Sequence, residues 1–160
     1  MKRLPEPTRL TLYVDGSCDG NQNVNASTRA GWGVVVVEGD SGLGRGSGEI
    51  ITEFSGPVST SPSEDDFIGA EVGSNNTAEL SGLFAGLRWL LTEGGQDAVR
   101  IRVDSQYAGN IATGAWRAKA NRELAARVQS VWAEVATQRD LTWDHVRAHR
   151  GHRWNERADH

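Results

Sequence analysis

The chain has 160 residues, of which 38% are hydrophobic and 24% charged, with 17 Lys and Arg against 21 Asp and Glu and a single Cys. These values are typical of one globular domain over residues 1–160, and no run approaches the roughly 20 apolar residues that span a membrane. We therefore expect no membrane partner. The lone Cys18 excludes an internal disulfide, and no apolar leader is visible near Met1, so we expect a cytoplasmic protein.

The net charge of −4 is unevenly distributed along the chain. Residues 1–99 carry a net charge of −8, and residues 100–160 carry +4. The negative total argues against nucleic-acid binding. The division suits an acidic, metal-holding half beside a basic half that faces a polyanion, although a random fluctuation on a solvated surface gives the same count. Charge alone leaves these interpretations open.

The first part of the chain predicts three strands. Leu10, Leu12 and Val14 alternate with polar residues, and a run of four valines starts at Val34. A polar loop or wide hairpin connection follows the first strand and a glycine-rich turn follows the second, which predicts an antiparallel meander. The predicted strands are 9–15, 32–38 and 49–55, and the connections are 16–31 and 39–48.

The remaining elements alternate between helices and strands. Residues 56–73 contain two Pro, three Ser and an acidic run, which predicts a long exposed loop. A helix is predicted to start near Ser74 or Asn75 and to stop at Gly94. The later elements are a strand at 99–103, a short helix at 105–113, a helix around 124–135, a strand at 141–147 and the first turns of a last helix at 154–160.

This order of elements predicts an α/β fold. The first strand of the meander would lie beside the parallel fourth and fifth strands, which gives a five-stranded mixed sheet of order 3-2-1-4-5 with strand 2 antiparallel. Helices are expected on both faces of the sheet.

Three acidic residues could meet at one edge of that sheet. Asp15 and Asp104 each end a strand, each followed by a tight polar turn, and the carboxyl ends of parallel strands are where open α/β sheets bind ligands. Glu79 lies in the first turn of the first helix, where an acid also complements the helix dipole. Each acid alone has a structural explanation. Three converging carboxylates would repel one another, so such a cluster requires a cation such as Mg²⁺ or Mn²⁺.

The histidines suggest a second metal hypothesis. All four lie in the last sixteen residues, which could indicate zinc. No Cys assists them, and no H-E-x-x-H pattern is present. Solvated or helix-capping histidines are therefore the favoured interpretation.

Four sequence blocks, in order and over nearly the whole chain, resemble the signature blocks of ribonuclease H type 1. They are residues 14–17 (VDGS), 75–80 (NNTAEL), 103–107 (VDSQY) and 149–159 (HRGHRWNERAD). The resemblance implies a ribonuclease H-like fold. It also implies an endonuclease that hydrolyses the RNA strand of RNA/DNA hybrids and leaves 5′-phosphate and 3′-hydroxyl ends.

The resemblance further implies the residues of the site. Asp15, Glu79, Asp104 and Asp159 would be the metal ligands for two Mg²⁺ ions, which Mn²⁺ could replace. His149 would assist proton transfer or product release, a role that suits an imidazole at neutral pH.

The implied substrate-binding residues are mostly amides. Such side chains suit the 2′-hydroxyls and base edges of a hybrid. Asn75 and Asn76 could also cap the helix, and Trp116 could instead belong to the core. The implied residues are Asn21, Asn75, Asn76 and Gln106 for the minor groove, Ser74 and Asn121 for a DNA-strand phosphate, and Trp116 beside the DNA strand.

Two departures from the family pattern leave an alternative open. The basic protrusion of some members is represented at most by residues 116–122, and the family's last helix normally continues beyond the position of Asp159. The C-terminal helix is thus apparently truncated, and the alternative to an active monomeric enzyme is a hybrid-binding module made inactive by its shortened end. A phosphatase with Asp15 as nucleophile is disfavoured, because Ser17 stands where that chemistry commonly places a second acid.

Overall fold

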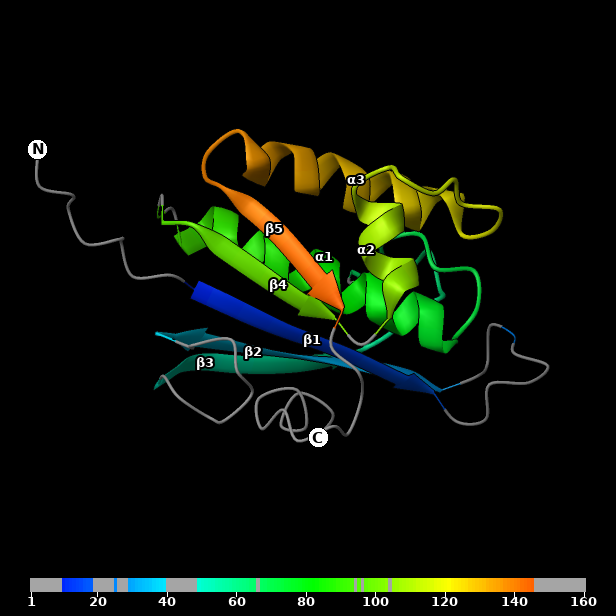
Figure 1. Cartoon of the computed structure of the whole chain (residues 1–160). Helices are drawn as coiled ribbons and strands as arrows, with labels where there is room; N and C mark the ends of the chain where they lie inside the picture. The colour runs from blue at the N-terminus through cyan, green and yellow to red at the C-terminus, as the bar shows by residue number, and fades with distance from the viewer. Residues whose placement is uncertain are drawn as a thin grey trace, which may run out of the picture.

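The computed structural model shows a five-stranded sheet with three helices (Figure 1). The described residues are 10–18, 25, 29–39, 49–65, 67–93, 95, 97–103 and 105–145. The strands are β1 (Leu10–Cys18), β2 (Ala30–Glu38), β3 (Glu49–Pro57), β4 (Val99–Val103) and β5 (Leu141–His145). The helices are α1 (Asn75–Glu93), α2 (Gln106–Ala112) and α3 (Arg122–Ala136). In this part of the chain no helix is long and apolar enough to cross a membrane.

The strand order is β3-β2-β1-β4-β5, which confirms the predicted mixed sheet. β2 is antiparallel to both of its neighbours, and β1, β4 and β5 are parallel. The parallel pairing of β1 with β4 ends at Val14 opposite Val103, whereas the antiparallel pairing of β1 with β2 continues to Cys18 opposite Ala30. The prediction of a tight turn directly after Asp15 is therefore wrong. The partner strand β2 starts two residues earlier than predicted and extends the ladder.

The main core lies between one face of the sheet and all three described helices. Leu12, Val14 and Ile101 point from the sheet into this layer and pack with α1, α2 and α3. Helix α1 approaches β1 closely, because a Cβ at Gly82 would lie 2.9 Å from a methyl carbon of Val14. The predicted last helix at 154–160 lies outside the described residues, so the described helices cover one face only.

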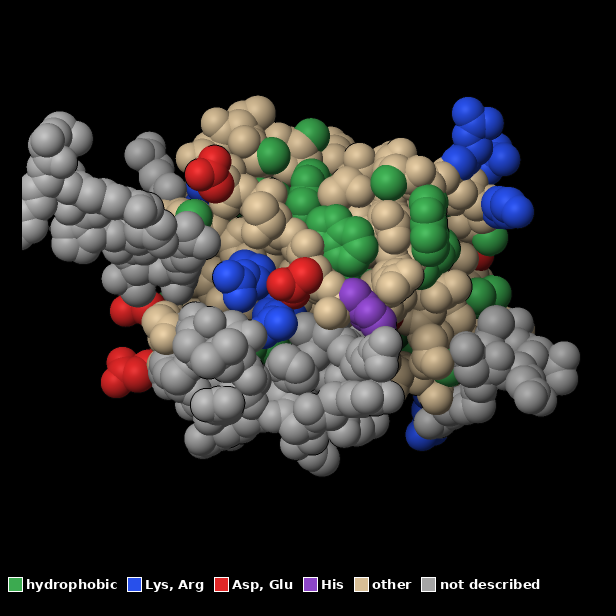
Figure 2. Space-filling view, viewed as in Figure 1, with side chains coloured by type: hydrophobic (Ala, Val, Ile, Leu, Met, Phe, Trp, Pro, Cys, Tyr) green, Lys and Arg blue, Asp and Glu red, His purple; other side chains and the backbone are tan. Residues whose placement is uncertain are grey.

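The second face of the sheet carries its own buried cluster. Tyr13, Val35 and Val37 are at most 2% exposed. Arg102 donates from Nε to Asp144 Oδ1 at 2.9 Å and from Nη1 to the Tyr13 hydroxyl at 3.3 Å. Burial lowers the pKa of Arg102, but the hydrogen bonds and charges of Tyr13 and Asp144 outweigh it and raise the pKa above its ordinary value. Figure 2 looks onto this face and shows basic, acidic and His side chains together where β5 ends.

The segment from β3 to α1 is a loop, as predicted, and residues 62–65 are exposed, but other parts of it are buried. Val58 and Ile68 pack against the main core, and Ala70 is 1% exposed. The segment is also tied to the rest of the fold, because the amide of Val58 donates to Ala30 O at 2.9 Å and the amide of Glu71 donates to Asn121 Oδ1 at 2.7 Å. The apolar residues that anchor this segment are scattered in the sequence without helical or strand spacing. They therefore give no periodic signal from which their burial could be predicted.

The edge strand β3 contains a β-bulge. Thr52 pairs with Val36 and Ile50 pairs with Val37, so Ile51 falls between two consecutive pairs. Its side chain is 46% exposed. A bulge of this kind bends a strand and increases its twist.

Candidate functional site

The start of α1 is fixed by a reciprocal cap between two buried hydroxyl residues. The amide of Thr77 donates to Ser74 Oγ at 3.1 Å, and the amide of Ser74 donates to Thr77 Oγ1 at 2.8 Å. This is the geometry of a capping box, which satisfies amides that the first helical turn leaves without partners. Ser74 is 8% exposed, so this residue, predicted to contact a phosphate, also has a structural role. Asn75 and Asn76 follow it in the first turn, and both are exposed.

Asp15 and Glu79 are brought together by one backbone amide. The N–H of Gly16 donates to Asp15 Oδ1 at 2.9 Å and to Glu79 Oε1 at 2.9 Å. Asp15 is 4% exposed and Glu79 is 3% exposed. One carboxylate comes from β1 and the other from α1, 63 positions later in the chain. The sequence prediction that these two acids meet at the end of the parallel β1–β4 ladder is consistent with this geometry.

Gly16 makes this approach possible. A Cβ at this position would lie 2.6 Å from both the Cβ of Ala78 and the backbone nitrogen of Glu79. Real Cβ atoms do not tolerate such distances, so only glycine lets β1 touch the first turn of α1 here. Sequence reasoning did not assign Gly16 a role in the site. The available signal was that Gly16 directly follows Asp15, an acid predicted to end a strand.

The other predicted catalytic residues fall outside the described residues. These are Asp104, His149 and Asp159, and the predicted groove residue Asn21 lies outside them as well. Within the described ranges, no group of three His, Cys, Asp or Glu side chains could hold a metal ion. The described part of the site is therefore the pair of Asp15 and Glu79.

Asn121 is a buried junction between two segments. It is 7% exposed, has the left-handed backbone conformation (φ 52°) and precedes the first residue of α3. Its Oδ1 accepts the amide of Glu71, three residues before the Ser74 cap. A backbone N–H requires an acceptor, so this contact orients the side-chain amide, whose Nδ2 is the remaining donor. The structure thus connects the two predicted phosphate-contacting residues through residues 71–74, and sequence reasoning missed the role of Glu71.

The last two predicted substrate-binding residues lie at the two ends of α2. Gln106 is its exposed first residue. Trp116 follows the helix and is 47% exposed, so the alternative that placed Trp116 in the core is wrong. Arg117, Lys119 and Arg122 are exposed in the same connection to α3, and Figure 2 shows basic side chains at this end of the molecule.

Comparisons with known proteins agree with this arrangement. The sequence model of the family described as RNase H matches residues 7–160. The ribonuclease H of Cupriavidus necator is 29% identical, over 94% of this chain and 90% of that protein. Among solved structures, RNase H1 of the halophilic archaeon Halobacterium salinarum is 28% identical with a TM-score of 0.63, over 94% of this chain and 92% of that chain. LC11-RNase H1, solved in complex with an RNA/DNA hybrid, has a TM-score of 0.64 at 23% identity, over 94% of this chain and 91% of that chain.

Proposed function

Because this chain belongs to the ribonuclease H family, we propose that it is an endonuclease that hydrolyses the RNA strand of RNA/DNA hybrids with divalent metal ions. The cut leaves 5′-phosphate and 3′-hydroxyl ends. The observation that carries the proposal is the buried pair of Asp15 and Glu79 on the amide of Gly16. The hybrid bound to LC11-RNase H1, a protein of the same fold, supports the substrate class.

The residues present fit Mg²⁺ or Mn²⁺. Both cations prefer hard oxygen ligands, and the described pair offers only carboxylate oxygens. Two carboxylates held at one amide repel each other, and a bound cation relieves that repulsion. Asp15 and Glu79 would hold the metal ions together with Asp104 and Asp159. When bound, the ions lower the pKa of water and neutralise charge on the scissile phosphate.

The protein's own groups set the position of this chemistry. The amide of Gly16 holds one oxygen of each carboxylate, so neither side chain must be ordered when the substrate arrives. Burial of both acids excludes bulk water and strengthens their electrostatic effect on nearby charges. His149 is the proposed proton carrier, since a neutral imidazole can accept a proton and later release it.

Hybrid recognition is assigned to exposed amides around this pair. Asn75, Asn76 and Gln106 are exposed at the starts of α1 and α2, and Asn21 completes the proposed set. An amide both donates and accepts, which matches the 2′-hydroxyl that distinguishes RNA from DNA. Trp116 offers a ring beside the DNA strand, and Ser74 with Asn121 would contact one of its phosphates. The enzyme is proposed to act as a cytoplasmic monomer.

A cleavage assay tests the proposed function directly. The full chain is incubated with a hybrid labelled on its RNA strand, with Mg²⁺, Mn²⁺ or EDTA in parallel. We expect fragments ending in 3′-hydroxyl with either metal and no fragments with EDTA. Binding of the hybrid without cleavage under both metals would instead support the alternative of an inactive hybrid-binding module. Cleavage that persists in EDTA would contradict the metal site.

Substitutions at Asn121 separate its structural role from the proposed phosphate contact. Asn121→Ala removes the acceptor of the Glu71 amide, so the free energy of unfolding should fall by about 1–2 kcal/mol in urea denaturation. Asn121→Asp keeps an acceptor and tolerates the left-handed backbone, so it should fold normally.

The aspartate variant should nevertheless bind hybrid about tenfold or more weakly, because a carboxylate replaces the donor that faces the phosphate. Hybrid affinity measured by fluorescence anisotropy in EDTA checks this. An aspartate variant with wild-type affinity would remove Asn121 from the phosphate site.

A further inference from the structure

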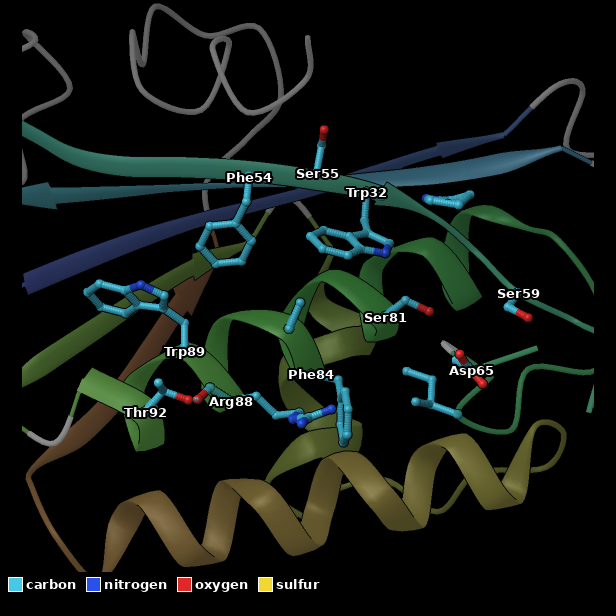
Figure 3. A pocket seen from close by; sticks show the side chains of 14 residues that line it. Trp32, Phe54, Ser55, Ser59, Asp65, Ser81, Phe84, Arg88, Trp89 and Thr92 are labelled. Atoms are coloured by element: carbon cyan, nitrogen blue, oxygen red, sulfur yellow. Dashed lines mark hydrogen bonds between the residues drawn. The ribbon is translucent and has the colours of Figure 1, made fainter. Parts of the chain in front are cut away.

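A cavity of about 540 Å³ lies between the edge of the sheet and α1, and neither Asp15 nor Glu79 lines it (Figure 3). This volume falls in the range of small-molecule sites. Side chains from β2, β3, α1 and the segment after β3 line it. The apolar lining consists of Trp32, Phe54, Pro57, Ile68, Phe84, Ala85 and Trp89.

The aromatic wall of this cavity is held rigidly. The rings of Trp32 and Phe54 meet edge to face, with their centroids 6.1 Å apart and an interplanar angle of 81°. α1 presses against the base of Trp32, since a Cβ at Gly82 would lie 3.1 Å from the Trp32 Cβ. Phe84 and Trp89 of α1 also line the cavity, and Figure 3 shows Trp89 on the side of α1 that faces the sheet and Phe84 on the side that faces α3. Flat, preformed walls of this kind suit a planar aromatic ring.

One positively charged side chain, that of Arg88, lies beside this aromatic wall. The guanidinium of Arg88 lies over the Phe84 ring, 5.7 Å from its centroid. In the described part of the chain Arg88 has no ion-pair partner, whereas Arg127 and Arg139 each have a Glu. Among the described residues that line the cavity, the one carboxylate is that of Asp65. In Figure 3, Asp65 and Trp89 lie on opposite sides of Phe84. The cavity therefore offers a positive charge beside aromatic rings and a negative charge at a distance from Trp89.

The polar lining offers both hydrogen-bond donors and hydrogen-bond acceptors. The guanidinium of Arg88 and the indole nitrogens of Trp32 and Trp89 can only donate. Ser59 Oγ already donates to Glu64 Oε1, and Thr92 Oγ1 donates to the carbonyl of Arg88, so toward a ligand these two hydroxyls can only accept. A ligand with acceptors for Arg88 and the indoles, and with donors for Asp65 and the two hydroxyls, complements this lining.

We propose that the cavity binds a mononucleotide. Its base supplies the planar ring and the acceptors, an exocyclic amine supplies the donor for Asp65, and its phosphate pairs with Arg88. Stacking of a base on an aromatic side chain favours binding, and Arg adds a cation–π and a charge-assisted contribution. This site uses none of the residues assigned to hybrid cleavage and does not depend on that function.

Isothermal titration of the full chain with AMP tests the proposal. Adenosine and ribose 5-phosphate are titrated as the two halves of the ligand. EDTA is present throughout, so that no phosphate is bound through metal ions at Asp15 and Glu79. We expect AMP to bind at least tenfold more tightly than either half. Equal affinity for AMP and adenosine, or no heat with AMP at millimolar concentration, would overturn the proposal.

Two variants locate the binding, and thermal unfolding of each confirms that it is folded. Arg88→Gln removes the cation, and Ala85→Leu fills the cavity from α1. Each should weaken AMP binding at least tenfold. Arg127→Gln removes an exposed arginine of α3 outside the cavity and should bind AMP as the wild type does. Wild-type affinity in Arg88→Gln, or the same loss in Arg127→Gln, would refute recognition of the phosphate in this cavity.

Discussion

Replacing Asp15 with Asn should abolish hybrid cleavage and leave the fold intact. The substitution removes one negative charge from the buried pair, and the loss of one such charged group lowers turnover by about 10²–10³-fold or more. Asn can still accept the hydrogen bond from Gly16, so the local geometry is retained. Removing one of two neighbouring carboxylates also relieves their repulsion, so Tm without metal should be unchanged or higher.

Metal binding is tested by measuring thermal unfolding at increasing Mg²⁺ concentrations. Mg²⁺ should raise the Tm of the wild type, because a ligand that binds only the folded state stabilises it. It should have little effect on Asp15→Asn. Glu134→Gln, an exposed residue on α3, serves as the control and should behave as the wild type in both assays. Full cleavage activity in Asp15→Asn would refute the assignment of this carboxylate to the metal site.

Gly16→Ala should produce the largest loss of stability among these variants. The new methyl group would lie 2.6 Å from the backbone nitrogen of Glu79 and from the Cβ of Ala78, neither of which can move without shifting α1. Overpacking of this kind costs about 3 kcal/mol. The shift would also pull Glu79 away from its amide partner, so cleavage should be lost together with stability. Urea denaturation gives the first quantity, and the hybrid assay gives the second.

Gly31→Ala provides a matched control in the neighbouring strand. A Cβ at Gly31 would have the Gly56 carbonyl oxygen as its nearest atom, at 3.4 Å, which is ordinary contact. Its unfolding free energy should therefore stay within about 1 kcal/mol of the wild type. Equal denaturation midpoints for the two alanine variants would show that β1 and α1 are not closely apposed at Gly16.

The described elements with a clear hydrophobic period could be predicted from the sequence, and those set by tertiary contacts could not. Alternation in β1 and the leucine spacing of α1 gave both elements and led to the strand order. The extension of β1 to Cys18 depends on pairing with β2. Polar residues such as Gly16 and Ser17 show no hydrophobic alternation from which this extension could be predicted. The segment after β3 looked exposed for a similar reason, because its anchoring residues Val58 and Ile68 are isolated in the sequence.

The candidate site divides in the same way. That Asp15 and Glu79 could meet was predicted from the place of Asp15 at the end of a strand and of Glu79 in the first turn of a helix. The amide that joins them belongs to Gly16. Its hydrogen bond to Glu79 links segments 63 positions apart, so it cannot be predicted from local residue spacing. The contact of Asn121 with the Glu71 amide is equally non-local, so the structural function of that asparagine appeared only with the fold.

The bulge at Ile51 has a consequence for how two copies of this chain can meet. β3 is one of the two outer strands of the described sheet, and such a strand offers its backbone to any other extended chain. The kink breaks the regular spacing that a second copy would need to continue the sheet. Glu49 and Glu53 flank the kink and are exposed, so antiparallel pairing of two β3 strands centred on Ile51 would place their carboxylates opposite one another. The edge is thus protected against sheet-to-sheet aggregation by its shape and its charge.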